Sequence, residues 1–241
     1  PQGDLKVAPT PTTWVRALPT PRHGARLVLV PKLLIATTNP GKIAELRGLL
    51  EGCGWDVVTP ADIGIAIDVE EDGETYHDNA RIKALAGVQA SGLVTLADDS
   101  GIEIQAMGGE PGVRSARFLR PDATYEERFA EIERQLAGKS LAERAARFVA
   151  VIAVAEPRKG EVRFAEGEIR GIISPEPRGE HGFGYDPIFW SPSQNATTAE
   201  LPEHEKAIIS HRARAIANAR QILLEILNDY RDPDSTYSRA G

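Results

Sequence analysis

The stretch GLVTLADDSG, residues 92–101, joins a short apolar run to two adjacent carboxylates. The apolar part, 93–97, has the length of a buried strand, and a turn is expected at Asp98 and Asp99. Two neighbouring carboxylates at the end of a buried strand are costly unless a cation or a proton compensates them. A magnesium ion would do so, because it takes carboxylate oxygens and waters and shares phosphate ligands. A solvated turn is the alternative, and this stretch by itself is compatible with both.

Strand-like and helix-like segments alternate around this stretch. A buried strand over 33–36 precedes a helix over about 40–50, for which Asn39 is a good N-cap and Pro40 suits the first helical position. A second helix over about 76–90 opens with a Thr-x-x-Asp capping pair. Further strands are expected at 102–105, 147–155, 161–173 and 187–190, with helices from about 122 to 138 and up to about 228. This order predicts an α/β fold with a mixed twisted sheet flanked by helices.

Composition indicates the bounds of the folded domain, the location of the protein and the class of its partners. Residues 1–31 hold six of the 17 prolines and are expected to be an irregular extension, 32–230 the folded domain, and 231–241 a flexible tail. No apolar run approaches the roughly 20 residues that cross a bilayer, and the start lacks the order of a signal peptide. We therefore expect no membrane contact and a cytoplasmic location. A net charge of −7 argues against nucleic acid as a partner but not against a small phosphorylated ligand.

The junction between the first strand and the first helix has the character of a phosphate cradle. Backbone N–H groups and the helix dipole favour an anion there, Gly41 permits close approach, and Lys42 adds a positive charge. The junction lacks the Walker spacing, and a plain capped helix is the alternative. The residues concerned are Thr37, Thr38, Asn39, Pro40, Gly41 and Lys42.

Three further segments carry polar groups that could serve a nucleotide. The acidic run 70–73, followed by Lys83 on the second helix, could supply a metal ligand and a phosphate contact, or could be a solvated loop. Glycines on both sides of Phe183 leave its ring free to stack on a planar base, with Asp186 as an acceptor, or the ring could be buried in a hairpin. At the start of the last helix, His211 and Arg212 could donate to base carbonyls, although a solvated basic helix start is the plain alternative.

Taken in order, five segments resemble the inosine triphosphate pyrophosphatase family. They are ATTNPGKIAEL, EEDGETYHDNARIKA, LADDSGIEIQAMGGEPGVRSAR, HGFGYDPIF and EKAIISHRARA, and they span about 33–227. The resemblance implies two lobes with an active-site cleft between them, a magnesium requirement and a homodimer. It also implies hydrolysis of noncanonical purine nucleoside triphosphates (ITP, dITP, XTP) to the monophosphate and pyrophosphate. Position 38, here Thr38, often carries glycine in relatives.

The same resemblance implies roles for individual residues. Asp99 matches the general base, Lys83 is the second catalytic residue, and Glu70 with Asp99 match the metal ligands, supported by Asp98. Residues 37–42, Lys83 and Lys206 match the triphosphate side, and Ser100 matches a substrate contact. The implied base pocket consists of Phe183, Gly184, Tyr185, Asp186, His211 and Arg212.

Three other readings of the sequence remain open. A related pyrophosphatase could act on modified pyrimidine or methylated nucleotides. A phosphomonoesterase that uses Asp98 or Asp99 is disfavoured because this adjacent pair lacks the D-x-D order expected of that chemistry. A nucleotide-binding regulator without turnover is disfavoured because acid, cation and base-contact elements are all present. Donors that bond the 6-keto group would face the amino group of adenine unproductively, which gives a physical basis for rejecting adenine.

Overall fold

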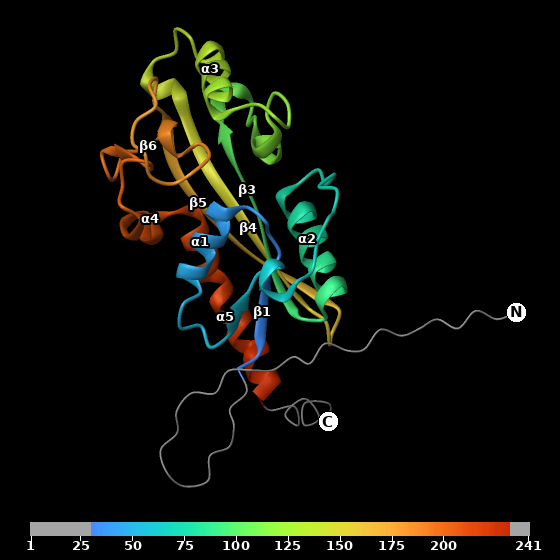
Figure 1. The fold of residues 1–241 in the computed structure, drawn as a ribbon. Helices are drawn as coiled ribbons and strands as arrows, with labels where there is room; N and C mark the ends of the chain where they lie inside the picture. Colours follow the sequence, from blue (N-terminus) through green and yellow to red (C-terminus); the bar gives the residue numbers. More distant parts are fainter. Residues whose placement is uncertain (1–29, 232–241) are drawn as a thin grey trace, which may run out of the picture.

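A seven-stranded sheet forms the centre of the molecule in the computed structural model, which describes residues 30–231 (Figure 1). The strand order is β2-β1-β3-β4-β5-β6-β7, in which β1 runs parallel to β2 and β3 and all other neighbours are antiparallel. The predicted mixed α/β fold is confirmed. The strands are β1 (Lys32–Ile35), β2 (Asp56–Val58), β3 (Val94–Ile104), β4 (Ala145–Glu156), β5 (Glu161–Ile173), β6 (Phe189–Ser191) and β7 (Ala196–Thr197).

Helices cover both faces of this sheet. Helix α2 packs on β3 and β4 from one side, whereas α5 packs on β4 and β5 from the other, next to α1 (Figure 1). The α-helices are α1 (Pro40–Leu49), α2 (Tyr76–Ser91), α3 (Tyr125–Gln135), α4 (Glu203–Ile209) and α5 (His211–Arg231). Short 3-10 turns are η1 (Ala61–Ile63), η2 (Gln105–Met107), η3 (Gly112–Arg117), η4 (Leu141–Arg144) and η5 (Asp186–Ile188).

The local capping signals act as predicted. Asn39 is the N-cap of α1, where its side chain accepts from the backbone N–H of Lys42, and Pro40 opens the helix. Thr75 and Asp78 form a reciprocal capping box at the start of α2. These contacts satisfy N–H groups that a helix start leaves unpaired, so each helix begins where the sequence indicates.

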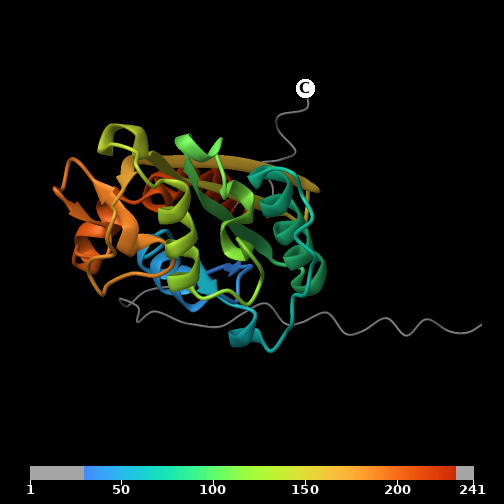
Figure 2. The same cartoon turned by 90° about the horizontal axis from the view of Figure 1, so that it is seen from above.

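Two of the four hydrophobic clusters in residues 30–231 form the cores of two lobes. One core packs β1, α1 and α5 around residues such as Leu33, Leu46 and Leu223, and the other packs α3 and β6 around residues such as Ile104, Ile132 and Phe189. The long strands β3, β4 and β5 contribute to both cores. Seen from above, α2 and the segment carrying α4 and β6 lie on opposite sides of the molecule (Figure 2).

Some sequence-based boundaries were wrong. The expected turn at Asp98 and Asp99 does not exist, because β3 pairs with β4 without interruption from Thr95 to Ile104. The last helix is not continuous through Ser210, whose extended backbone (ψ 153°) separates α4 from α5. Strand β2 was not predicted, and β6 begins at Phe189 after a 3-10 turn. The predicted extension 1–31 and tail 231–241 lie almost entirely outside the described residues.

Candidate active site

The site is built on a free edge of strand β3. Strand β1 pairs with β3 only as far as Leu96, where the N–H of Ala36 donates the last hydrogen bond to the Leu96 carbonyl oxygen. From Ile102 onward this edge is covered again, because the Ile102 N–H donates to Ser115 of η3. The interval 97–101 between these contacts pairs with β4 alone. This interval contains both acidic residues and the following Ser-Gly.

Asp98 points to the face covered by α1 and α5. Its carboxylate lies 2.7 Å from Lys42 Nζ and 3.3 Å from Arg212 Nε, and it accepts a hydrogen bond from the Ser100 hydroxyl. Although burial opposes ionisation, Arg212 and Lys42 hold the pKa of Asp98 well below its usual range. Asp98 is therefore a buried anion neutralised by two cations.

Asp99 points to the opposite face, because successive side chains of a strand alternate. Its Oδ1 lies 2.7 Å from Lys83 Nζ of α2, which also lies 3.1 Å from Glu71 Oε2. Burial raises the pKa of Asp99 to about 6, against the attraction of Lys83. Its second oxygen, Oδ2, is buried and has no hydrogen-bond partner within the described chain. The predicted catalytic pair, Asp99 and Lys83, is thus in direct contact.

The phosphate-cradle segment 37–42 lies where the chain leaves β1. The Asn39 N–H donates to Thr37 Oγ1, while Thr38, Asn39 and Pro40 are exposed. Lys42 reaches from the first turn of α1 to the carbonyl oxygen and carboxylate of Asp98. The start of α1 therefore presents its positive dipole end beside the free edge of β3.

A cavity of about 80 Å³, the base cavity, lies on the α1 and α5 face and is lined by most of the predicted base-pocket residues. Its volume corresponds to two or three water molecules, at about 30 Å³ each. Phe183 packs directly over Gly41, where an added Cβ would lie 2.5 Å from the ring. The cavity is lined by Asn39, Lys42, Ser100, Gly101, Ser115, Ala116, Tyr125, Phe148, Phe183, Gly184, Tyr185, Lys206, His211 and Arg212.

His211 is part of this cavity as a neutral side chain. Its ring stacks on Phe148 with centroids 4.7 Å apart, and its Nδ1 has no partner within residues 30–231. Burial, reinforced by the nearby Arg212, keeps the pKa of His211 well below its usual value. The unpartnered nitrogen leaves the imidazole free to bond a ligand in the cavity.

Two predicted residues have other partners than expected. The Asp186 carboxylate accepts from the Phe183 N–H and from Thr198 Oγ1, and it forms an ion pair with Lys206. Asp186 therefore holds the Phe183 loop rather than presenting a free acceptor. Lys206 lies 5.0 Å from the centroid of the Phe183 ring, at the base cavity and not beside Lys83.

Sequence reasoning missed Glu45, and within the acidic run 70–73 it singled out Glu70 rather than Glu71. Glu45 forms an ion pair with Arg212 and accepts from the Ser210 hydroxyl, so it links α1 to the start of α5. Its position three residues after Lys42, on the same side of the helix, is a signal that could have identified it. Of the acidic pair at 70–71, Glu71 forms an ion pair with Lys83, whereas Glu70 forms no side-chain hydrogen bond or ion pair within the described chain.

The residues around Asp99 fit a hard divalent cation. Two carboxylates, Asp99 and Glu71, share Lys83, and the unpartnered Oδ2 of Asp99 supplies a free anionic oxygen. No group of three histidine, cysteine or carboxylate ligands converges anywhere in residues 30–231. Two carboxylates are sufficient for magnesium, since this ion usually keeps several waters and binds substrate phosphates.

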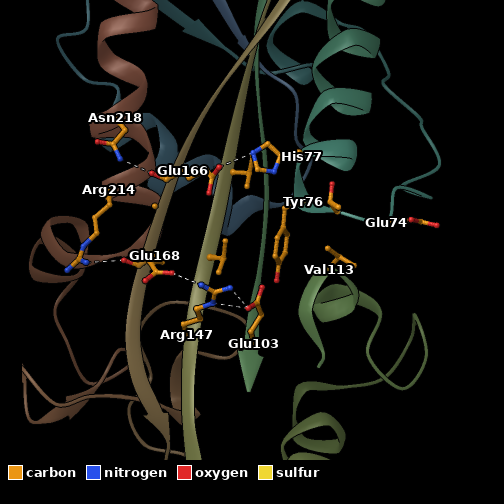
Figure 3. Close-up of a pocket in the computed structure, with 14 residues that line it drawn as sticks. Glu74, Tyr76, His77, Glu103, Val113, Arg147, Glu166, Glu168, Arg214 and Asn218 are labelled. Carbon is orange, nitrogen blue, oxygen red and sulfur yellow. Dashed lines mark hydrogen bonds and ion pairs between the residues drawn. The ribbon is translucent and has the colours of Figure 1, made fainter. Parts of the chain in front are cut away.

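A second cavity, of about 650 Å³, lies on the α2 face of strands β3 to β5 (Figure 3). Its charged side chains pair with one another, as Arg147 does with Glu103 and Glu168. His77 Nε2 lies 3.0 Å from Glu166. None of the predicted site residues lines this cavity. Within the described part of the chain, no helix is long and apolar enough to span a membrane.

The chain is similar to known proteins over most of its length. The sequence model of the Ham1 family matches residues 33–222. The dITP/XTP pyrophosphatase of Desulforamulus reducens is 46% identical over 192 residues, covering 80% of this chain and 95% of that protein. The dITP/XTP pyrophosphatase of Bacillus subtilis is 41% identical over 197 residues, covering 82% and 99%. The solved structure of a HAM1 protein from Coxiella burnetii is 38% identical with a TM-score of 0.73, covering 80% of this chain and 98% of that one.

Proposed function

Since the chain belongs to the Ham1 family, we propose that it hydrolyses noncanonical purine nucleoside triphosphates such as ITP, dITP and XTP to the monophosphate and pyrophosphate. The names of the relatives from Desulforamulus reducens and Bacillus subtilis, dITP/XTP pyrophosphatase, support this substrate class. They give no support to a substrate among modified pyrimidine or methylated nucleotides.

One observation carries the proposal: the free edge of β3 separates a base cavity on one face from the Asp99, Lys83 and Glu71 cluster on the other. A nucleotide lying across this edge has its base beside Phe183 and its phosphates beside Lys42 and the start of α1. Asp99 and Lys83 then lie at the phosphate end. This arrangement supports cleavage within the triphosphate rather than chemistry on the base.

In the proposed reaction, different residues act on the water, the phosphates and the base. Asp99 accepts a proton from, or orients, the attacking water. Lys83 and Lys42 offset the charge that develops on the phosphates. His211 and Arg212 donate to the keto oxygen of the base, so an adenine amino group leaves buried donors unpaired.

Magnesium is the metal that we propose for this site, held by Asp99 and a carboxylate of the 70–71 pair. The contact between Glu71 and Lys83 favours Glu71 over Glu70 as the second ligand. When bound, magnesium neutralises negative charge on the phosphate oxygens. Asp98, which is neutralised by Lys42 and Arg212, takes the role of a supporting carboxylate.

We further propose a homodimer in the cytoplasm, as the family resemblance implies. Size-exclusion chromatography with light scattering measures the mass of the protein in solution. A mass of twice the chain's 26.1 kDa supports the dimer, and a single-chain mass contradicts it.

A product assay tests the proposed reaction. The full chain is incubated with magnesium and ITP, dITP, XTP, GTP, dUTP or ATP, and pyrophosphate and orthophosphate are measured separately. We expect pyrophosphate from ITP, dITP and XTP at rates well above those with ATP. Orthophosphate as the first product, or a preference for dUTP, would overturn the proposal.

A further inference from the structure

One buried positive charge near the base cavity has no ion-pair partner within residues 30–231. Arg128 of α3 is only 3% exposed. Its Nη2 lies 3.5 Å from the carbonyl oxygens of Arg120 and Pro121, and its buried Nε has no hydrogen-bond partner among residues 30–231. The adjacent carboxylate, that of Glu127, is exposed and paired with Arg120. The Arg128 guanidinium thus contacts two carbonyl oxygens and the side chains of Tyr125 and Tyr185 but forms no ion pair within residues 30–231.

The other buried cations of the described chain differ from Arg128 in this respect. Lys83 is paired with Asp99 and Glu71, and Arg212 is paired with Asp98 and Glu45. The remaining two ion pairs are Lys206 with Asp186 and Arg144 with Glu133. A buried charge without a partner is destabilising, so its presence in a folded protein needs a compensating reason.

Arg128 lies directly behind two aromatic residues of the base cavity. Its Cζ is 4.9 Å from the centroid of the Tyr125 ring, and Tyr125 packs edge-to-face on Tyr185 with centroids 5.4 Å apart. Both tyrosines line the cavity. Burial raises the pKa of Tyr185, and Arg128 opposes that rise, as expected for a guanidinium close to the phenol.

The charged groups that face the cavity leave the field of Arg128 uncancelled. Lys42, Lys206 and Arg212 each have a carboxylate partner. His211 is kept neutral by burial and by the neighbouring cations. Because Arg128 is buried, its charge is screened less than a charge at the surface and acts over a longer distance.

We propose that Arg128 is a specificity-determining residue that favours an anionic nucleobase in this cavity. This proposal rests on the proposed function and refines its substrate class. Among the purines concerned, xanthine carries two keto groups and loses a ring proton near neutral pH, whereas hypoxanthine keeps its proton until the solution is alkaline. Arg128 therefore raises the preference for XTP, bound with a deprotonated base, relative to dITP.

Substitution of Arg128 tests the charge directly. The measured quantity is the ratio of kcat/KM for XTP to kcat/KM for dITP at pH 7.5. We expect Arg128→Gln to lower this ratio at least fivefold and Arg128→Lys to retain it. The matched control is Arg134→Gln, which removes an exposed arginine from the same helix and leaves the ratio unchanged. An equal loss for both substrates in Arg128→Gln means that Arg128 only holds the 120–121 loop, and overturns the proposal.

The pH dependence gives a second readout. In the wild-type protein, the ratio of kcat/KM for XTP to kcat/KM for dITP is expected to rise as the pH is raised through the pKa of the xanthine base. This rise is expected to be smaller in Arg128→Gln. Wild-type and variant profiles that run parallel contradict the assignment. Arg128→Lys keeps the comparison valid if Arg128→Gln does not fold.

Binding separates this inference from the proposed reaction. Calorimetric affinities for the monophosphates XMP and IMP give the same base comparison without turnover. If the wild-type protein releases no pyrophosphate, the proposed hydrolysis is wrong. The proposed role of Arg128 is then tested by the binding measurements. An XMP to IMP affinity ratio that Arg128→Gln does not change overturns the assignment, whatever the turnover.

Discussion

Asp98 and Asp99 are adjacent in sequence, yet their carboxylates lie on opposite faces of strand β3. Asp98 contacts Lys42 and Arg212 on the α1 and α5 face, and Asp99 contacts Lys83 on the α2 face. Each carboxylate has one oxygen without a hydrogen bond in the described chain, but Asp98 Oδ1 lies 3.3 Å from Arg212 Nε, whereas the ion pair of Asp99 is formed by Oδ1 and leaves Oδ2 without one. The two acids therefore have different consequences when they are replaced.

Asp98→Asn is expected to destabilise the fold. The neutral amide leaves Lys42 and Arg212 without the carboxylate that compensates them in a fully buried position, a change that typically costs about 3–5 kcal/mol. Urea denaturation at neutral pH measures the free energy of unfolding. A loss of less than 1 kcal/mol would show that Glu45 alone compensates Arg212.

Asp99→Asn is expected to abolish most turnover while nucleotide binding persists. An amide cannot accept the proton from water, and removal of a general base typically lowers the rate about 10²–10⁴-fold. Pyrophosphate release and calorimetric binding of ITP measure the two effects separately. Unchanged turnover in this variant contradicts the assignment of Asp99 as the base.

The neighbouring glutamates provide a matched pair for the metal. Glu71 forms an ion pair with Lys83 beside Asp99, and Glu70 forms no side-chain hydrogen bond or ion pair in the described chain. We expect Glu71→Gln to raise the magnesium concentration for half-maximal rate about tenfold or more, and Glu70→Gln to change it little. The reverse pattern would place the second ligand at position 70.

Gly41→Ala is expected to raise KM without unfolding the protein. An added Cβ would lie 2.5 Å from the Phe183 ring, and overpacking of this kind costs about 1–3 kcal/mol, which corresponds to about fivefold to 150-fold in affinity if the cost falls on the bound state. Gly48→Ala on the same helix is the control, because nothing lies within 4 Å of its added Cβ. A KM unaffected by Gly41→Ala would mean that Phe183 moves aside without cost.

His211 makes the stability of the fold depend on pH. Its pKa in the folded state lies well below the unfolded value near 6.5, so the unfolded chain binds more protons below that pH. The contribution of neutral His211 to the free energy of unfolding is therefore fully present above about pH 7. It is lost as the pH is lowered, by up to about 1.4 kcal/mol per pH unit. Denaturation between pH 8 and pH 5 is expected to show a shallower loss for His211→Gln than for wild type. Parallel curves would exclude His211 as the source.

Elements specified by local signals could be predicted from the sequence. The caps at Asn39 and Thr75 depend on side chains two or three residues from the groups they satisfy, and both helices begin as expected. The start of α5 also had such a signal, because Ser210 accepts from the N–H of Ala213 in the manner of an N-cap serine. The continuous hydrophobic and basic pattern on both sides of Ser210 obscured this signal.

The path of β3 could not be predicted in the same way. Adjacent aspartates favour a turn locally, and their burial in a strand depends on cations supplied from distant parts of the chain. Lys42 precedes Asp98 by 56 residues and Arg212 follows it by 114. Tertiary charge compensation thus decided a backbone conformation that local propensity would have assigned differently.

The strands that join the two hydrophobic cores have a mechanical consequence. Strands β3, β4 and β5 pass through both lobes, so a change in the angle between the lobes has to bend the sheet itself. The free edge at 97–101 lies between the two cores, where such curvature changes the spacing between Lys42, Asp99 and Phe183. In the proposed function, binding of the base and alignment of the reacting groups are thereby coupled through the bending of one sheet.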